Sequence, residues 1–327
     1  MEYIKFIAGL TILVVSGKYL VQGGVSIARY FNISKLVIGL TVVAFGTSAP
    51  ELIVSINAAV SGNPEIAFGN VVGSNITNIA LILSFTALLI PIPVHKNSLR
   101  FDWPMMMLAS VLLYVFILND KLDWYEGATL FVLLLVYLFF LITKSEKEPE
   151  TLGDVEKVKQ LSLGVSLLLI LISSAGLAFG ADFLVDGASS IAESWGVSKR
   201  VISLTIVAIG TSAPELTASI IAALKKETDI SIGNIIGSNI FNIMAVLGIT
   251  SMIKSIPIDH IAFSFDIIWM IFLAILLFLF IYPFKTVFLN RAEGLLLLLA
   301  YIIYVSMVLF GFDFESISSS LSHLVSG

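Results

Sequence analysis

One hexapeptide that could bind a cation occurs twice in apolar stretches of the sequence. Residues 46–51 read Gly-Thr-Ser-Ala-Pro-Glu, and residues 210–215 repeat them letter for letter. A carboxylate at membrane depth costs about 2.5–3.5 kcal/mol on insertion scales, so Glu51 and Glu215 each need a partner or a function. Carboxylate, hydroxyl and carbonyl oxygens are hard ligands that suit Ca²⁺ and Na⁺. The two hexapeptides therefore predict a cation site.

The neighbours of each glutamate supply further oxygen atoms. On a helix, residues three and four apart share a face. The hydroxyl residues that can face the same way as the glutamates are Thr47, Ser48 and Ser55 with Glu51, and Thr211, Ser212 and Ser219 with Glu215. Pro50 and Pro214 should interrupt their helices and release carbonyl groups about one turn back, at Ala44 and Ala208 among others. A plain proline kink with neutralised glutamates is the alternative, but two unpaired carboxylates are a high cost for a kink.

A second repeated motif adds serine and asparagine side chains. The pattern Gly-Ser-Asn-Ile-x-Asn occurs at residues 73–78 and again at 237–242. In each copy the serine and the last asparagine share a helix face, and these pairs are Ser74 with Asn78 and Ser238 with Asn242. Asn75 and Asn239 lie a quarter turn or more away, and hydrogen bonding to backbone or neighbouring helices explains them as well as ion binding does.

Small residues precede these polar groups. Gly69 with Gly73, and Gly233 with Gly237, form small-xxx-small pairs that let helix backbones approach closely.

The chain has no cysteine, and its three histidines lie in predicted loops or the tail, which argues against a soft-metal site. Two carboxylates neutralise one Ca²⁺, or hold two or three Na⁺ with carbonyl help, so the two occupancies should compete. No cofactor is expected.

The composition predicts helices that cross a membrane. Of 327 residues, 58% are hydrophobic and 13% are charged, and the mean hydropathy is +1.02. Apolar runs of about 20 residues recur along the chain, each long enough to span the bilayer. About ten spans are expected, near residues 3–25, 36–60, 66–92, 104–118, 125–143, 161–184, 201–224, 230–253, 263–282 and 293–310. We therefore predict an all-α membrane protein and no enzyme.

The chain reads as a duplication. Its two halves align without a gap, at an offset of about 164 residues, from Ser34-Lys35 and Ser198-Lys199 to the paired asparagine motifs. The predicted organisation is a first five-helix repeat at 1–143, a cytoplasmic linker at 144–160, a second five-helix repeat at 161–311 and a short tail at 312–327, with the two copies of the repeated motifs near 34–84 and 198–248. An odd number of spans per repeat makes the repeats inverted.

Basic residues predict the orientation. With the N-terminus outside, most Lys and Arg residues fall in cytoplasmic loops, so both termini are expected outside. Lys18, Asp182 and Asp186 are charged residues in or beside predicted spans. Lys18 is near a cytoplasmic end and is expected to extend its amino group to the interface. Asp182 and Asp186 lie near the outer end of the sixth span, where solvation and ion entry remain open alternatives.

Together, the paired motifs resemble the two α-repeats of the sodium/calcium exchanger family, in the calcium/cation antiporter superfamily. The resemblance covers nearly the whole chain and is closest to prokaryotic members, which implies a multi-pass protein of the prokaryotic cytoplasmic (inner) membrane. It implies that Glu51 and Glu215 are carboxylate ligands shared by Ca²⁺ and Na⁺. It also implies hydroxyl ligands at Thr47, Ser48, Thr211, Ser212, Ser74 and Ser238, carbonyl ligands at Ala44 and Ala208, and a site completed by Asn78 and Asn242.

One residue departs from part of that family. Potassium-dependent members and certain archaeal ones carry an aspartate where Asn242 stands. The site of this chain is therefore less negative, and we expect no K⁺ requirement.

Several functions fit the sequence. The first is an antiporter that exchanges Na⁺ for Ca²⁺ by alternating access, with ions bound at the midplane between the repeats. A Ca²⁺/H⁺ antiporter is the alternative within the same fold, although the hydroxyl-rich motifs favour Na⁺. A cation channel would usually place equivalent residues around an oligomer axis, whereas here they lie within one chain. A scaffolding role has no extramembrane domain to support it. The expected partners are Ca²⁺, Na⁺ and the lipid bilayer, with no nucleic acid and no obligate protein partner.

Overall fold

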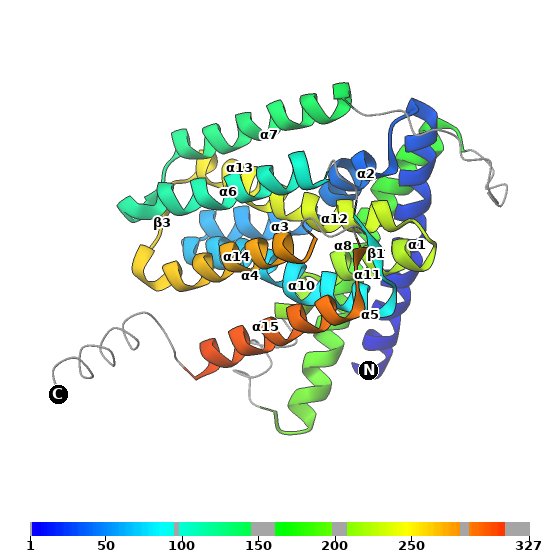
Figure 1. The fold of residues 1–327 in the computed structure, drawn as a ribbon. Coiled ribbons are helices and arrows are strands. Elements are labelled where there is room, and N and C mark those ends of the chain that lie inside the picture. Colours follow the sequence, from blue (N-terminus) through cyan, green and yellow to red (C-terminus); the bar gives the residue numbers. More distant parts are fainter. Residues whose placement is uncertain (1, 95–97, 145–160, 198–207, 282–287, 311–327) are drawn as a thin grey trace. The chain divides into compact units, whose positions relative to one another are not determined.

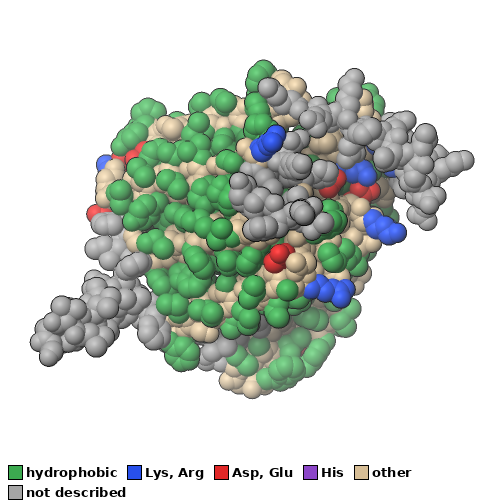
Figure 2. All heavy atoms as spheres, viewed as in Figure 1, with side chains coloured by type: hydrophobic (Ala, Val, Ile, Leu, Met, Phe, Trp, Pro, Cys, Tyr) green, Lys and Arg blue, Asp and Glu red, His purple; other side chains and the backbone are tan. Residues whose placement is uncertain are grey.

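The computed structural model describes residues 2–94, 98–144, 161–197, 208–281 and 288–310, and these are almost entirely helical (Figure 1). Within the described residues, nine helical stretches are long and apolar enough to cross a membrane. The predicted seventh span, 201–224, begins outside the described residues and continues as two shorter helices. Hydrophobic side chains dominate the face seen in Figure 2, as expected of a surface in contact with lipid. The predicted all-α membrane fold is confirmed.

The described part of the first half contains seven α-helices, joined in places by tighter or wider helical turns. In order these are α1 (Glu2–Phe31), α2 (Lys35–Ile38), the π-helix η1 (Gly39–Val43), α3 (Ala44–Val60), α4 (Pro64–Thr77), the π-helix η2 (Asn78–Leu83), α5 (Ser84–Leu89), β1 (Ile92–Pro93), the π-helix η3 (Ser98–Asp102), α6 (Trp103–Phe116), the 3₁₀-helix η4 (Ile117–Asn119), β2 (Lys121–Leu122) and α7 (Trp124–Lys144).

The second half follows the same plan in its described part. It contains α8 (Leu163–Ser194), α10 (Ala208–Thr211), α11 (Ala213–Leu224), α12 (Thr228–Phe241), the π-helix η6 (Asn242–Leu247), α13 (Gly248–Ile253), β3 (Ile256–Pro257), α14 (His260–Ile281), β4 (Phe288–Leu289) and α15 (Arg291–Leu309). The series α12, η6, α13 and β3 repeats the series α4, η2, α5 and β1, with each boundary 164 residues later. The duplication in the sequence is thus a duplication of local structure.

Local sequence accounts for where several helices begin. The Ser34 hydroxyl accepts a hydrogen bond from the Val37 N–H and caps α2, and Ser162 caps α8 through Val165 in the same way. A capping box between Asn290 and Glu293 starts α15. Each such cap satisfies N–H groups that would otherwise lack a partner in a low-dielectric environment.

The helices gather into two compact units that do not coincide with the halves of the sequence. The first unit comprises residues 1–51 and 134–241, and the second comprises 52–133 and 242–327. Each unit therefore combines segments from both halves. The predicted repeat boundaries describe the sequence duplication and stay a prediction. The linker, from residue 145, and the tail lie outside the described residues.

In the first unit, α1 packs along α8 and both contact α11 (Figure 1). Glycines allow the close approach, because a Cβ added to Gly180 would lie 3.0 Å from the Leu13 backbone nitrogen. The buried core around this pair includes Leu13, Leu20 and Leu177. On the other side of the unit, α12 packs against α2, η1 and α11.

In the second unit, α4 contacts η2, η6 and α14, α15 packs on α5, and α6 packs on α14. The Trp103 indole N–H donates a hydrogen bond to the Ala274 carbonyl at 2.7 Å, which fixes α6 to α14. Two short antiparallel strand pairs, β1 with β4 and β2 with β3, also lie in this unit. Each pair joins a segment of the first half to a segment of the second.

Candidate cation site

Oxygen-bearing side chains from α3, α11 and α12 meet inside the first unit. Thr47, Glu51 and Glu215 are buried, with exposed fractions of 0%, 2% and 0%. The two carboxylates are close enough to interact electrostatically. Among the described residues, no group of three or more His, Cys, Asp and Glu side chains gathers as a metal centre, here or at any other place. A cation held here would therefore rely on two carboxylates and neutral oxygen ligands.

Most of the carboxylate oxygens in this cluster lack a partner. The Ser48 hydroxyl donates a hydrogen bond to Glu215 Oε1 at 3.3 Å. The other oxygen of Glu215 and both oxygens of Glu51 are buried without a hydrogen-bond partner within the described part of the chain. Buried charges persist only when they are paired or coordinate an ion, so these oxygens are the strongest structural sign of a cation site.

Thr47 connects α3 to α12. Its hydroxyl oxygen lies 3.1 Å from the Ala44 carbonyl oxygen, 3.1 Å from Asn234 Oδ1 and 3.3 Å from Ser238 Oγ. The structure thus brings five residues named from the sequence into two sets of contacts, namely Ala44, Thr47 and Ser238, and Ser48 with Glu215. It adds Asn234, which the sequence analysis did not single out.

Asn234 is fully buried and holds α12 to α11. Its amide nitrogen donates hydrogen bonds to Ser219 Oγ at 2.9 Å and to the Glu215 carbonyl oxygen at 3.4 Å. Ser231, one turn earlier on α12, donates to the Ser219 carbonyl at 2.9 Å. The signal available in the sequence was the repeat itself, because Asn70 occupies the equivalent position and donates to Ser55 at 3.3 Å in the second unit.

Close backbone contact places α12 beside α3. A Cβ added to Gly237 would lie 2.7 Å from the Leu40 carbonyl oxygen, and one added to Gly233 would lie 2.7 Å from the Leu36 carbonyl oxygen. This confirms the packing role expected for Gly233 and Gly237. Among the described residues, a Cβ added to Gly69 would meet only Phe263 Cε1, at 3.7 Å, and one added to Gly73 would meet nothing within 4 Å, so the close backbone approach predicted for these two glycines stays a prediction.

The prolines of the two hexapeptides behave differently. Helix α3 continues through Pro50, so the predicted interruption there is wrong. Upstream of this proline the backbone is widened in the π-helix η1, which ends at Val43, before the hexapeptide begins. In the second copy the helix does break, because Ser212 leaves helical geometry between α10 and α11, and Pro214 lies in the first turn of α11.

The remaining predicted ligands of the second hexapeptide lie around that break. Thr211 ends α10, and Ser212 is buried, with its hydroxyl unpartnered among the described residues. Ala208 is the first residue of α10. Thr211 and Ser212 therefore lie where the helix is interrupted, between α10 and α11.

Ser74, Asn78 and Asn242 belong to the second unit and are buried. Asn78 and Asn242 each begin a π-helix, and their side-chain amides have no hydrogen-bond partner in the described ranges. π-helical turns occur frequently at functional sites. Asn239 donates to the Ile235 carbonyl at 2.7 Å, which supports a backbone role for that residue.

Among the described residues, the charged side chains outside the motifs are either exposed or have a polar partner. Lys18 and Asp182 are exposed, and Asp186 lies 3.5 Å from Lys5. Asp266, a carboxylate in α14 that the sequence analysis passed over, accepts a hydrogen bond from the Tyr304 hydroxyl at 2.8 Å.

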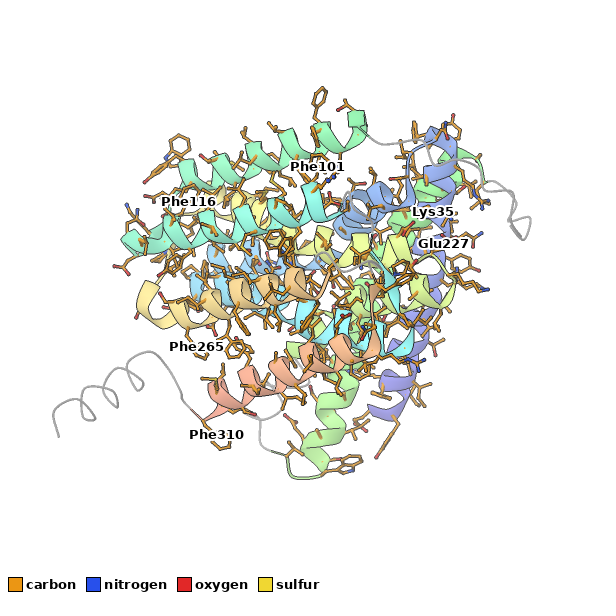
Figure 3. All side chains as sticks on the ribbon, viewed as in Figure 1. Lys35, Phe101, Phe116, Glu227, Phe265 and Phe310 are labelled. Carbon is orange, nitrogen blue, oxygen red and sulfur yellow. The ribbon has the colours of Figure 1, made fainter. Side chains whose placement is uncertain are left out.

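An ion pair joins the start of α2 to the turn before α12 in the first unit. Lys35, at the start of α2, lies 2.8 Å from Glu227, in the turn before α12, and the two are seen together in Figure 3. The pair helps to hold α2 against α12 and hence the start of α3 near Asn234.

Comparison with known proteins agrees with this arrangement. The family described as sodium/calcium exchanger protein matches residues 2–143 and 165–310. CaxA of Alkalimonas amylolytica is 42% identical over 91% of this chain and 95% of its own length. The inner membrane protein YrbG of Escherichia coli is 35% identical over 92% and 95%. A solved structure of the sodium-calcium exchanger NCX_Mj aligns with a TM-score of 0.79 and 34% identity, covering 94% of this chain and 98% of that one. The family is one of transporters, so the chain is an integral multi-pass membrane protein that belongs to the sodium/calcium exchanger family.

Proposed function

We propose that this protein is a secondary antiporter that moves Na⁺ in exchange for Ca²⁺ by alternating access. The observation that carries the proposal is the pair of buried glutamates, three of whose four carboxylate oxygens have no partner among the described residues. A divalent cation would neutralise both charges, and two or three Na⁺ could replace it with help from neutral oxygens. Competition for one set of carboxylates would couple the two fluxes.

The proposed ligand set follows the sequence motifs and is supported in part by contacts. Glu51 and Glu215 supply the charge. Neutral oxygens come from the hydroxyls of Thr47, Ser48, Thr211, Ser212 and Ser238 and the carbonyls of Ala44 and Ala208. Ser74, Asn78 and Asn242 are retained on the grounds of their sequence alone. YrbG is named as an inner membrane protein, which supports the same location for this chain.

Uptake of radioactive Ca²⁺ into sealed proteoliposomes tests the exchange. Vesicles loaded with Na⁺ and diluted into Na⁺-free medium should accumulate Ca²⁺, while vesicles without a gradient should not. The Glu215→Gln variant serves as the matched inactive control. Failure of an outward Na⁺ gradient to drive uptake in wild type would overturn the proposal.

The same buried oxygens favour a second candidate, a Ca²⁺/H⁺ antiporter. Carboxylates without partners can bind protons as well as cations. Vesicles with an outward H⁺ gradient and no Na⁺ distinguish the candidates. Uptake driven by H⁺ alone would replace Na⁺ with H⁺ as the coupling ion.

A further inference from the structure

Asn234 is a buried polar side chain whose contacts reach the proposed ligands, although it is not one of them. Its orientation is set by its surroundings. The Glu215 carbonyl can only accept a hydrogen bond, so the atom 3.4 Å away must be the amide nitrogen of Asn234. The amide oxygen therefore faces the Thr47 hydroxyl, at 3.1 Å.

Thr47 has one hydroxyl proton and more than one place to direct it. The Ala44 carbonyl and Asn234 Oδ1 are both 3.1 Å away and both accept hydrogen bonds. If the proton points to Ala44, it occupies a carbonyl that is a proposed ligand. If it points to Asn234, the Ala44 carbonyl and the lone pairs of Thr47 are both released to a cation. The Ser238 hydroxyl is also in reach, at 3.3 Å, but it is itself a proposed ligand.

We infer that Asn234 is a positioning residue for cation binding, whose amide oxygen takes the hydrogen bond from Thr47 so that the oxygens of Thr47 and Ala44 face the ion. The inference rests on the proposed function, since it assigns Asn234 a role at the same site. Ser219 and the Glu215 carbonyl hold the amide nitrogen, so the side chain cannot turn away without losing both contacts. Asn234 thus transmits the position of α11 to a ligand on α3.

A double-mutant cycle on the purified, reconstituted protein tests this role. Asn234→Leu is close in volume and removes both hydrogen-bonding functions. It should raise the apparent KM for Ca²⁺ by about three- to tenfold, the range expected for losing one hydrogen bond that orients a ligand, with maximal flux little changed. In a Thr47→Val background the same substitution should have no further effect on KM. In a Thr47→Ser background, which keeps the hydroxyl, its effect should return.

Ser231→Ala is the control for plain anchoring. Ser231 joins α12 to α11 through Ser219, as Asn234 does, but no described contact links it to Thr47. Its loss should leave the KM for Ca²⁺ within about twofold of wild type. If Ser231→Ala raises KM as much as Asn234→Leu does, or if Asn234→Leu acts equally in the Thr47→Val background, the inference is wrong. Asn234→Ala replaces the leucine variant if that one does not insert.

A transport-independent measurement separates this inference from the proposed function. Ca²⁺ and Na⁺ should each raise the thermal midpoint of the detergent-solubilised wild type, because a ligand that binds the folded state stabilises it. If Ca²⁺ binds but Na⁺ does not drive uptake, the proposed exchange is wrong. The double-mutant cycle of Asn234 and Thr47 is then measured on the affinity for Ca²⁺, taken from the shift in thermal midpoint, instead of on KM. If neither ion shifts the midpoint, both the proposed function and the role of Asn234 are overturned.

Discussion

At the scale of single residues, Glu51 and Glu215 are buried, and three of their four carboxylate oxygens have no hydrogen-bond partner among the described residues. Only Glu215 Oε1 accepts a hydrogen bond that the described residues provide, from Ser48. A purely structural pair of buried carboxylates would be expected to have Lys, Arg or several N–H donors around it. The arrangement instead leaves room for cations as the missing partners.

Glu51→Gln and Glu215→Gln should each abolish Na⁺-driven Ca²⁺ uptake. Removing one carboxylate leaves a divalent ion half neutralised in a site of low dielectric, and we expect the loss of affinity to exceed about a hundredfold. The thermal midpoint in ion-free detergent should not fall, because glutamine removes a buried charge and keeps a side-chain oxygen that can still accept the Ser48 hydrogen bond at position 215. Glu193→Gln, at an exposed position near the end of α8, is the control and should transport normally. Uptake near the wild-type level in either glutamate variant would contradict the assignment.

Exchange should not require K⁺, because Asn242 is neutral. Its amide can offer an oxygen to a cation but adds no negative charge. Asn242→Asp would raise the number of carboxylates from two to three and favour one more cation, most strongly where water is excluded. The measurement is Na⁺-driven Ca²⁺ flux with K⁺ replaced by a large organic cation, in wild type and in Asn242→Asp. A collapse of wild-type flux without K⁺ would show that potassium binds elsewhere.

The buried position of the two glutamates could be predicted from the sequence, because charged residues are conspicuous within apolar stretches. Asn234 could not be assigned a role in the same way. Its importance depends on Thr47, which is 187 residues away in the chain, and on which end of its amide faces the hydroxyl. The sequence repeat draws attention to Asn234, because Asn70 is its equivalent in the first half, but only the folded structure shows what Asn234 contacts.

At the scale of helices, the two identical hexapeptides adopt different backbones. The first continues as a helix through Pro50, whereas the second is interrupted at Ser212. Identical local sequence cannot specify two conformations, so the difference arises from the packing around each copy. The π-helices that begin at Asn78 and Asn242 could not be predicted from the sequence either, because one widened helical turn does not change the pattern of apolar residues. The spans themselves could be predicted, since their length follows from the thickness of the bilayer.

Gly237→Ala should destabilise the contact between α12 and the start of α3. The added methyl group would meet the Leu40 carbonyl oxygen and the Ala44 Cβ, at 2.7 and 2.8 Å, and backbone atoms cannot yield as a flexible side chain can. Overpacking of this kind costs about 1–3 kcal/mol and should move Thr47 away from Ser238. We expect a lower thermal midpoint and a raised KM for Ca²⁺. Gly164→Ala, an exposed helical glycine with no described neighbour within 4 Å, should be neutral or slightly stabilising, and equal effects from both substitutions would refute the packing argument.

At the scale of the whole molecule, exchange should respond to membrane voltage. One Ca²⁺ moving against several Na⁺ on the same two carboxylates leaves charge unbalanced, and each net charge is worth about 2.3 kcal/mol per 100 mV. With three Na⁺ per Ca²⁺ the vesicle interior would become more negative as Ca²⁺ enters and Na⁺ leaves. Clamping the potential with a potassium ionophore should therefore change the rate. Flux that ignores the clamp would indicate electroneutral exchange.

The two halves of the chain should assemble when they are produced as separate polypeptides. Each compact unit takes segments from both halves, and the strand pairs β1 with β4 and β2 with β3 join them in the second unit. Cutting between Thr151 and Leu152, in the predicted linker, should give two fragments that copurify and transport Ca²⁺. Either fragment produced alone should be degraded or aggregate. A single half that purifies as a folded, monodisperse species would show that the halves are independent.

The way each unit combines segments from both halves of the chain also constrains how the gene for such a protein arose. An ancestor of half this length could not have built either unit from one copy, because each unit contains helices from both halves of the chain. The ancestor would have worked only as a pair of copies, and if each repeat has an odd number of spans, as predicted, those copies would have been inserted in opposite directions. Its positive residues could then have favoured neither side of the membrane. The excess of Lys and Arg in particular loops of this chain would date from after the two copies were fused, when each half was first free to evolve for one orientation.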